Sequence, residues 1–176
     1  IELKTCKNAY LCTGASGCGK TTVARIFATE VNKYLLDTGE WASSDPIEID
    51  GASNNGVENV RNIIAEASER SLEGMYKIYI IDEAQGLSSA AWQAFLKCIE
   101  EPPNYTIFIF CTTDPQKIPA TILNRVMRFN FSRLDFELIA NRLENICETE
   151  GYTNYQETCG YIAKTCNGGL RDAITS

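Results

Sequence analysis

One stretch of the sequence has the residue types and the spacing of a phosphate-binding loop. Residues 14–21 read Gly-Ala-Ser-Gly-Cys-Gly-Lys-Thr and fit the pattern G-x-x-x-x-G-K-[ST]. Glycines have no Cβ, so such a loop can turn its backbone N–H groups toward phosphate oxygens at the start of a helix. Lys20 would reach the β- and γ-phosphates of a nucleotide, and the Thr21 hydroxyl would bind Mg²⁺. The predicted nucleotide-binding residues are Gly14, Ala15, Ser16, Gly17, Cys18, Gly19, Lys20, Thr21 and Thr22.

The segments on either side of this loop favour a binding site over a plain glycine turn. Residues 9–13 are a short apolar run that predicts a buried strand, and residues 22–28 carry Val23, Ile26 and Phe27 at helical spacing. A strand, a glycine loop and a helix in this order are the context in which the pattern binds phosphate. The alternative is a glycine-rich turn before an ordinary helix. Such a turn does not require a strand, a glycine loop and a helix together.

Two carboxylates end another predicted strand. Residues 76–82 form a largely apolar run that finishes in Asp82, and Glu83 follows it. Ligands of an open parallel sheet bind at the carboxyl ends of its strands, so both side chains would lie beside the phosphate loop. We expect Asp82 to hold Mg²⁺, directly or through water, and Glu83 to orient and deprotonate the attacking water. The alternative is a solvated helix start, where Asp and Glu are also common.

A polar pair follows the next predicted strand, residues 106–111. Thr112 and Thr113 stand where a side chain can reach a γ-phosphate or its attacking water. On their own they are explained as well by a simple cap of the strand before the turn at Asp114 and Pro115.

The composition limits the kinds of protein this chain can be. It has 176 residues and a net charge of −7, which argues against a protein that coats nucleic acid through a basic surface. No run is long and apolar enough to span a membrane, and no signal peptide is visible. The chain begins at Ile1 and ends within a predicted helix, so we expect it to be part of a longer polypeptide.

Most of the eight cysteines are interpreted as buried thiols. No two have C-x-x-C spacing, and several lie inside apolar runs, as Cys111 does. Thiols in a protein with a nucleotide-binding core indicate a reducing, cytoplasmic environment rather than a disulfide scaffold. Because the chain has no histidine, any proton transfer must use a carboxylate, a lysine or water.

Strands and helices alternate along most of the chain, as in a parallel α/β sheet. Strands are predicted at residues 9–13, 47–50, 76–82, 106–111 and 126–131, and helices at 22–28, 57–67, 89–100 and 119–125. Residues 33–46 are predicted to be irregular. After Ser132 only helices are expected, at residues 134–146, around 161–163 and from Leu170. We therefore expect an α/β domain at residues 1–132 and a small helical domain at residues 133–176.

Together these features resemble an AAA+ ATPase, and more closely the γ/τ ATPase subunit family of bacterial DNA polymerase III clamp loaders. The most specific stretches are residues 48–53, 96–97, 100–103, 112–119, 121–125 and 169–173. The resemblance covers essentially the whole chain. It implies a P-loop NTPase fold, with a five-stranded parallel sheet between helices and an all-α lid, and ATP and Mg²⁺ as ligands. It also implies a cytoplasmic subunit that hydrolyses ATP to load a sliding clamp on primed DNA.

The resemblance assigns roles to three further residues. Thr113 matches the sensor that reads the γ-phosphate. Arg125 matches the arginine finger offered to the ATP of a neighbouring subunit, and Arg171 matches the second sensor, which reaches from the lid to the subunit's own nucleotide. From the sequence alone both arginines would be ordinary surface residues. Since a finger supplied by a neighbour links hydrolysis to assembly, the isolated chain is expected to be a weak ATPase. The implied catalytic residues are Lys20, Glu83, Thr113, Arg125 and Arg171.

Three departures from the family pattern affect these expectations. The family usually carries the four cysteines of a zinc module after the first helix, and residues 33–46 contain none, so no zinc site is expected. The finger motif, usually Ser-Arg-Cys, is Asn124-Arg125-Val126 here. Gln85 stands where the family often has histidine, close to the expected catalytic carboxylate.

The resemblance also implies partners. These are other clamp-loader subunits, in a pentamer of the full-length protein, the sliding clamp and primer–template DNA, with no membrane. The predicted helix starts at residues 53–56 and 88–89 could offer backbone N–H groups to DNA phosphates. Simple helix capping by Ser and Asn explains these residues as well.

Two other functions stay open. One is a scaffold that binds nucleotide within a clamp loader without hydrolysing it. Relatives of that kind typically lose the loop lysine or the acidic pair, and this chain keeps Lys20, Thr21, Asp82 and Glu83. The other is an AAA+ remodeller with a different task, such as a helicase loader, against which residues 112–117 and 170–173 argue.

Overall fold

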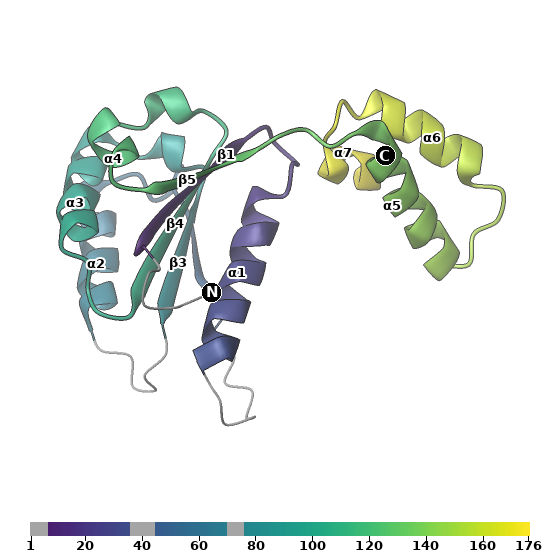
Figure 1. Ribbon diagram of the computed structural model, residues 1–176. Helices are drawn as coiled ribbons and strands as arrows, with labels where there is room; N and C mark the ends of the chain where they lie inside the picture. Colours follow the sequence, from purple (N-terminus) through teal and green to yellow (C-terminus); the bar gives the residue numbers. More distant parts are fainter. Residues whose placement is uncertain (1–6, 36–44, 70–75) are drawn as a thin grey trace. The chain divides into compact units, whose positions relative to one another are not determined.

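The computed structural model describes residues 7–35, 45–69 and 76–176 (Figure 1). The chain divides into two compact units, each described by itself. The first contains Ile1–Thr13 and Thr21–Phe129, and the second contains Gly14–Lys20 and Asn130–Ser176. The phosphate loop up to Lys20 is therefore grouped with the C-terminal helices.

The first unit is built around a five-stranded parallel sheet in the order β2-β3-β4-β1-β5. The strands are β1 (Ala9–Gly14), β2 (Ile47–Asp50), β3 (Lys77–Asp82), β4 (Thr106–Thr112) and β5 (Met127–Phe131). All five predicted strands are confirmed, with bounds that shift by one residue at most. Asp50 pairs with Asp82 and Thr13 with Thr112, so polar strand ends gather at one edge of the sheet.

The central strand β4 has the most continuously apolar sequence, and all seven of its residues are buried. This is the pattern of a parallel strand that is covered on both faces. Phe108 and Phe110 stack with ring centroids 6.4 Å apart, and Phe95 from a helix meets them edge-on at 5.6 and 5.2 Å. Such aromatic contacts stabilise a core beyond the apolar area that they bury.

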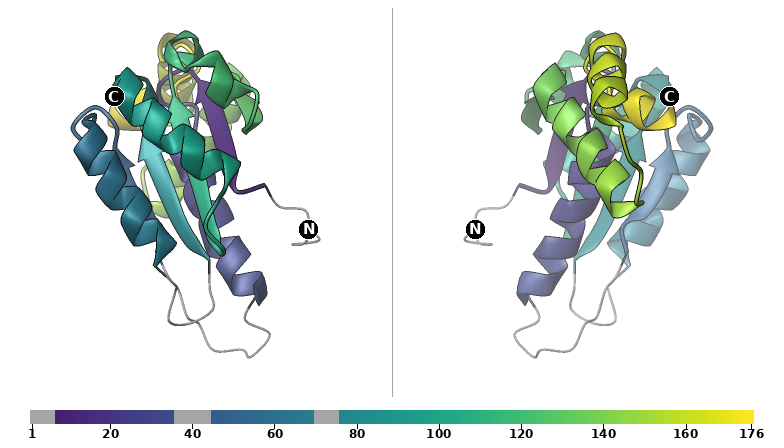
Figure 2. Two further views of the ribbon diagram at one scale, coloured as in Figure 1. Left: turned by 90° about the vertical axis from the view of Figure 1, so that its left-hand side faces the viewer. Right: turned by 90° about the vertical axis from the view of Figure 1, so that its right-hand side faces the viewer.

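Helices cover both faces of the sheet (Figure 1). α1 (Lys20–Leu35) lies on one face, and α2 (Val57–Ser68), α3 (Ser89–Glu100) and the short α4 (Ala120–Leu123) lie on the other. The left view of Figure 2 looks onto the second face, where α2 (blue) and α3 (teal) are neighbours. Single 3₁₀ turns, η2 (Ala84–Gly86) and η3 (Pro115–Lys117), follow β3 and β4.

The second unit ends in three helices, as expected from the sequence. They are α5 (Phe136–Thr149), α6 (Gln156–Thr165) and α7 (Leu170–Thr175). Their shared core consists of Ile139, Leu143, Cys159, Ala163 and Ala173. Residues 132–176, all of which the structure describes, contain no strand.

The helix α1 is longer than the sequence predicts. It continues to Leu35, so residues 33–35 are helical and the prediction of irregular structure there is wrong. Ala24, Ala28 and Val31 are buried at helical spacing, which continues the side of α1 that packs inward beyond the predicted end at residue 28. Residues 36–44 lie outside the described part of the chain. They contain most of the segment that was expected to be irregular and to lack a zinc site.

Candidate active site

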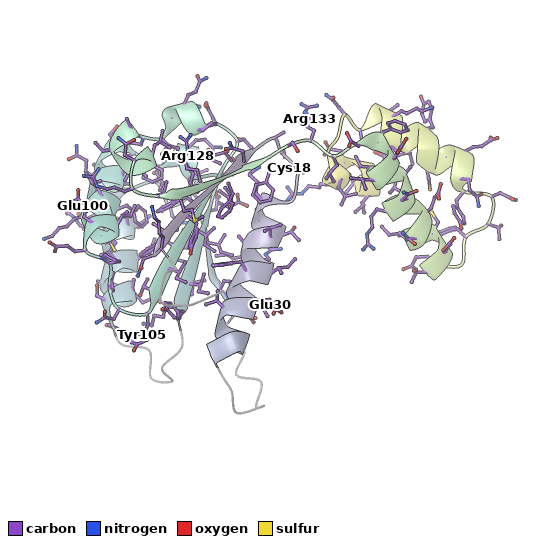
Figure 3. All side chains as sticks on the ribbon, viewed as in Figure 1. Cys18, Glu30, Glu100, Tyr105, Arg128 and Arg133 are labelled. Atoms are coloured by element: carbon purple, nitrogen blue, oxygen red, sulfur yellow. The ribbon has the colours of Figure 1, made fainter. Side chains whose placement is uncertain are left out.

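The phosphate loop joins β1 to α1, and its glycines stand where a side chain would clash or would strain the backbone. A Cβ added at Gly14 would lie 2.4 Å from the carbonyl oxygen of Phe131. Gly17 has a φ of 73°, a left-handed conformation that glycine adopts without steric cost. Cys18, labelled in Figure 3, is buried, and its thiol donates a hydrogen bond of 2.9 Å to the carbonyl of Ala15. Close backbone contacts therefore hold the loop.

Lys20 folds back over this loop. Its Nζ donates hydrogen bonds of 2.9 Å to the Gly14 carbonyl and 2.8 Å to the Ala15 carbonyl, and the residue is 7% exposed. A buried ammonium group needs such acceptors, because an unpaired charge away from water is costly. The loop thus holds a cation among its own backbone groups, while its neighbours Ser16 and Thr22 stand at the surface.

Arg171 lies beside the phosphate loop within the second unit. The backbone N–H of Leu170 donates a hydrogen bond of 3.2 Å to the Gly17 carbonyl. A Cβ added at Gly17 would lie 3.4 Å from the Cβ of Arg171. The start of α7 therefore packs on the loop, and Arg171 itself is exposed there.

Thr21 and Asp82 meet within the first unit. Thr21 Oγ1, in the first turn of α1, donates a hydrogen bond of 2.8 Å to Asp82 Oδ2 at the end of β3. The other carboxylate oxygen, Oδ1, accepts 2.9 Å from the backbone N–H of Glu83. The two residues predicted to bind magnesium are therefore brought together, and hydroxyl and carboxylate oxygens are the ligand types that Mg²⁺ takes.

Glu83 has an uncommon backbone. Its φ of 47° and ψ of 42° are left-handed, and it precedes the 3₁₀ turn η2. A non-glycine residue in this region is held there by its surroundings, and such residues cluster at functional sites. The Glu83 side chain is exposed, so its carboxylate is accessible to water.

One side-chain amide connects Glu83 to the end of β4. Gln85 Nε2 donates to Glu83 Oε2 and, over 3.1 Å, to Thr113 Oγ1. Gln85 Oε1 accepts a hydrogen bond of 2.6 Å from Thr112 Oγ1. The predicted base and the predicted phosphate sensor are thus linked through Gln85, which sequence reasoning noted only as a departure from the family.

Arg125 is bonded to neither the predicted base Glu83 nor the predicted sensor Thr113. Its Nη2 forms an ion pair of 2.7 Å with Glu100 Oε1, and its Nη1 donates 2.8 Å to the Thr121 carbonyl. Glu100 ends α3 and is labelled in Figure 3. Both ion-pair partners are more than one-third exposed, at 39% and 44% of the side chain. Nothing in the sequence indicated this ion pair, since the two residues come from separate elements.

The two helix starts proposed as DNA contacts differ in structure. Ser88 is the N-cap of α3, and its hydroxyl accepts 3.2 Å from the N–H of Ala91, so the capping alternative is correct there. Ser53 does not cap a helix. Its hydroxyl donates to Asp50, and this hydrogen bond is the main cause that lowers the pKa of the Asp50 carboxyl. The N-cap residue of α2 is Gly56, which has no side chain that could cap the helix.

The cysteines in the described residues are free thiols, most of them buried, as the sequence predicts. Within the described ranges no helix is long and apolar enough to cross a membrane. In the same part of the chain there is no group of three or more Cys, Asp or Glu side chains that could hold a metal ion by itself. A magnesium site at Thr21 and Asp82 would accordingly need further ligands from a nucleotide or water.

Known proteins resemble this chain along most of its length. The family described as DNA polymerase III, delta subunit, matches residues 1–135. The chain is 40% identical over 185 residues to DNA polymerase III subunit tau of Bacillus subtilis. It is 36% identical over 191 residues to DNA polymerase III subunit tau of Escherichia coli. These alignments cover 98% and 99% of this chain but 33% and 29% of the relatives, so the chain spans about a third of their length.

Solved structures share the fold. The RuvB Holliday junction branch migration motor of Thermotoga maritima superposes with a TM-score of 0.74 and 20% identity, over 96% of this chain and 52% of RuvB. A DNA polymerase III gamma subunit-related protein of the same organism gives a TM-score of 0.65 and 21% identity, over 90% of this chain and 55% of that protein. At such identities the likeness concerns the fold alone, and it confirms the expected α/β fold with a five-stranded parallel sheet between helices. The chain thus belongs to the family described as DNA polymerase III, delta subunit, and resembles the bacterial γ/τ clamp-loader subunits.

Proposed function

We propose that this chain binds and hydrolyses ATP as a subunit of a clamp loader that places a sliding clamp on primed DNA. The observation that carries the proposal is the hydrogen bond of 2.8 Å between Thr21 and Asp82. It joins the residue after the phosphate loop to the acidic end of β3, and Glu83 follows directly in the chain. Resemblance to the γ/τ subunits supports the task of clamp loading.

The phosphate loop supplies the binding half of the proposed site. Backbone N–H groups of the loop, at the positive end of α1, suit the oxygens of a triphosphate. The Lys20 ammonium now rests on two loop carbonyls, and a phosphate would replace those acceptors with charged ones. Arg171 is the proposed second sensor, and the packing of α7 on Gly17 supports its placement toward a bound nucleotide.

Thr21 and Asp82 fit a magnesium ion. Their oxygens already share one proton at hydrogen-bond distance, so a cation that takes the place of this proton would meet both. When bound, Mg²⁺ neutralises charge on the β- and γ-phosphate oxygens. Thr21 and Asp82 would hold it, the latter directly or through water.

Hydrolysis is assigned to the residues at the carboxyl ends of β3 and β4. Glu83 is the proposed general base, because its exposed carboxylate can accept a proton from an attacking water. Thr113, exposed after β4, is the proposed γ-phosphate sensor. Arg125 is the proposed finger for a neighbouring subunit, since it is exposed and held only by surface contacts.

The architecture suggests a division of labour along the chain. Residues 1–132 would form the nucleotide-binding domain and residues 133–176 the lid, with a cytoplasmic location that fits the resembled family. The partners would be other clamp-loader subunits, the clamp and primer–template DNA. Because Arg125 would act on a neighbour, the isolated chain would turn over slowly.

The test is ATP hydrolysis by the full-length protein with its partner subunits, measured with and without clamp and primed DNA. We expect hydrolysis that clamp and primed DNA stimulate together. Tight ATP binding without hydrolysis under every condition would favour the scaffold alternative. Hydrolysis that responds to neither clamp nor primed DNA would favour a different AAA+ remodeller.

A further inference from the structure

We propose that Gln85 is a positioning residue that couples the catalytic carboxylate of Glu83 to the phosphate sensor Thr113 through its side-chain amide. The proposal rests on the proposed function of these two residues. It goes beyond it by giving a role to a residue that stands where the resembled family often has histidine.

The orientation of the Gln85 amide is determined by its neighbours. The backbone N–H of Asp114 donates 3.0 Å to Thr112 Oγ1, so that oxygen already acts as an acceptor. Thr112 is 1% exposed, and a buried hydroxyl must donate its single proton to some acceptor. The acceptor in reach is Gln85 Oε1 at 2.6 Å. The carbonyl end of the amide therefore faces Thr112.

With the carbonyl end fixed, the NH₂ end faces the catalytic groups. An amide nitrogen carries two donor hydrogens. The structure assigns one of them to the Glu83 carboxylate and the other to Thr113 Oγ1, at 3.1 Å. The Thr113 oxygen is then an acceptor, which leaves its own proton free to be donated to a phosphate oxygen. One planar group thus sets the position of the carboxylate and the polarity of the sensor hydroxyl.

The backbone around Gln85 is held firmly enough to do this. Glu83 is left-handed, and its carbonyl accepts 2.8 Å from the N–H of Gly86 in the turn η2. A Cβ added at Gly86 would lie 2.8 Å from Ala52 Cα, so the turn packs directly on another backbone segment. Such support is what a positioning side chain requires, since small displacements of a catalytic group cost much activity.

Glutamine also differs from histidine in its response to pH. An amide stays neutral and keeps both an acceptor and two donors, whereas a protonated imidazole has donors only. A histidine at this position would lose its acceptor for Thr112 once protonated. The coupling through Gln85 is therefore expected to be independent of pH in the range where histidine titrates.

The central experiment compares Gln85→Leu with Gln85→His in steady-state ATP hydrolysis by the full protein with its partners. Gln85→Leu removes every hydrogen bond at similar size, so we expect kcat to fall about 10- to 100-fold, as for a lost hydrogen bond to a charged group, with KM within about twofold. At pH 8 the histidine of Gln85→His keeps an acceptor for Thr112 but only one donor, so it should retain part of the activity there and lose it below about pH 6.5, a limb that the glutamine protein lacks. A kcat of Gln85→Leu within twofold of wild type overturns the proposal.

Two controls separate positioning from folding. Gln93→Leu makes the same change at an exposed site on α3 and should leave kcat unchanged. Thr112→Val should lower kcat because it removes the donor that orients the amide, and Thr112→Ser should restore it. Loss of activity in Thr112→Ser equal to that in Thr112→Val would count against the orientation by this hydroxyl.

A measurement without hydrolysis keeps the proposal distinct from the proposed function. The Gln85 side-chain NH₂ resonances of the ¹⁵N-labelled chain, assigned by their loss in Gln85→Leu, should shift in both Glu83→Ala and Thr113→Val. If the wild-type protein hydrolyses no ATP, the proposed function fails. The resonances still show whether the Gln85 amide is coupled to Glu83 and Thr113. Resonances that stay unchanged in both variants overturn the coupling, even in an active ATPase.

Discussion

Thr21 Oγ1 donates a hydrogen bond of 2.8 Å to Asp82 Oδ2 across 61 positions of sequence. The contact arises because α1 begins and β3 ends at the same edge of a parallel sheet, next to each other in the first unit. Switch-point edges of such sheets are where ligands bind. A hydroxyl and a carboxylate that already meet need little rearrangement to share a cation.

Thr21→Val should weaken the Mg²⁺-dependent part of ATP binding. The change keeps the size of the side chain but removes the oxygen that would face the metal, so we expect the affinity for ATP with Mg²⁺ to fall about tenfold, or about 1.4 kcal/mol. Thr21→Ser keeps the hydroxyl and should bind normally. Fluorescent ATP titrations with and without Mg²⁺ measure the difference, and an equal Mg²⁺ effect in Thr21→Val and wild type would exclude Thr21 as a ligand.

Lys20→Ala should abolish ATP binding at micromolar concentrations. The variant removes the charge that two loop carbonyls now hold in a buried place, and an affinity loss of roughly 100-fold or more is expected for this charged contact. Lys77→Ala is a matched control, because Lys77 is also partly buried and its Nζ donates a hydrogen bond of 2.9 Å to a backbone carbonyl, that of Glu66. Calorimetric titration of both variants with ATP decides, and unchanged affinity in Lys20→Ala would sink the assignment of the loop.

Glu83→Gln should keep ATP binding and lose turnover. The amide cannot accept the proton of an attacking water, and loss of a general base lowers kcat by about 10²–10⁴-fold. Glu157→Gln, an exposed change in the first turn of α6, serves as the control. Single-turnover hydrolysis with saturating ATP is the measurement. Normal turnover in Glu83→Gln would remove this residue as the base.

Arg125→Ala should remove the gain in hydrolysis that assembly gives. A finger supplied in trans contributes about 10³–10⁵ in rate, whereas the slow hydrolysis of the isolated chain should not change. Glu100→Gln frees Arg125 from its ion pair. Exposed ion pairs are worth only about 0.2–1 kcal/mol, so we expect the rate of hydrolysis in the assembly to rise at most about fivefold. Glu58→Gln, which breaks the exposed pair with Arg61, is the matched control.

ATPase rates of mixed assemblies test this directly. Arg125→Ala subunits are titrated into wild-type subunits, and activity should fall with the fraction of interfaces that lack the arginine. Fast hydrolysis by a proven monomer would contradict a finger in trans.

Periodicity and strand-end chemistry were enough to predict most of the fold and the pairing of Thr21 with Asp82. Strand ends of a parallel sheet share an edge, so short-range patterns in sequence become long-range neighbours by a general rule. The ion pair of Arg125 with Glu100 follows no such rule, because it depends on how the end of α3 meets the loop before β5. The orientation of the Gln85 amide is equally absent from the sequence pattern, because it depends on the hydrogen bond that the buried Thr112 hydroxyl donates to Gln85 Oε1.

The grouping of the phosphate loop with the C-terminal helices was also not predictable. Sequence pattern places residues 14–20 between β1 and α1, as observed, but not against Arg171. The contact of α7 with Gly17 depends on the left-handed backbone of this glycine and on one backbone hydrogen bond. Neither has a sequence signature of its own.

The buried thiol of Cys98 should react more slowly than the partly exposed thiol of Cys166. Burial raises its pKa to about 11, so at pH 8 only about one thiol in a thousand is ionised, and the thiolate is the reactive form. Its alkylation rate should rise about tenfold per pH unit between pH 8 and 10, because both values lie below the pKa. Cys166, which is partly exposed in the second unit, should be labelled before Cys98. Timed alkylation with peptide mass spectrometry compares the two, with protein in guanidinium chloride as the reference in which the difference must vanish. Equal labelling rates in the folded protein would show that Cys98 is not the buried apolar side chain inferred from its place in α3.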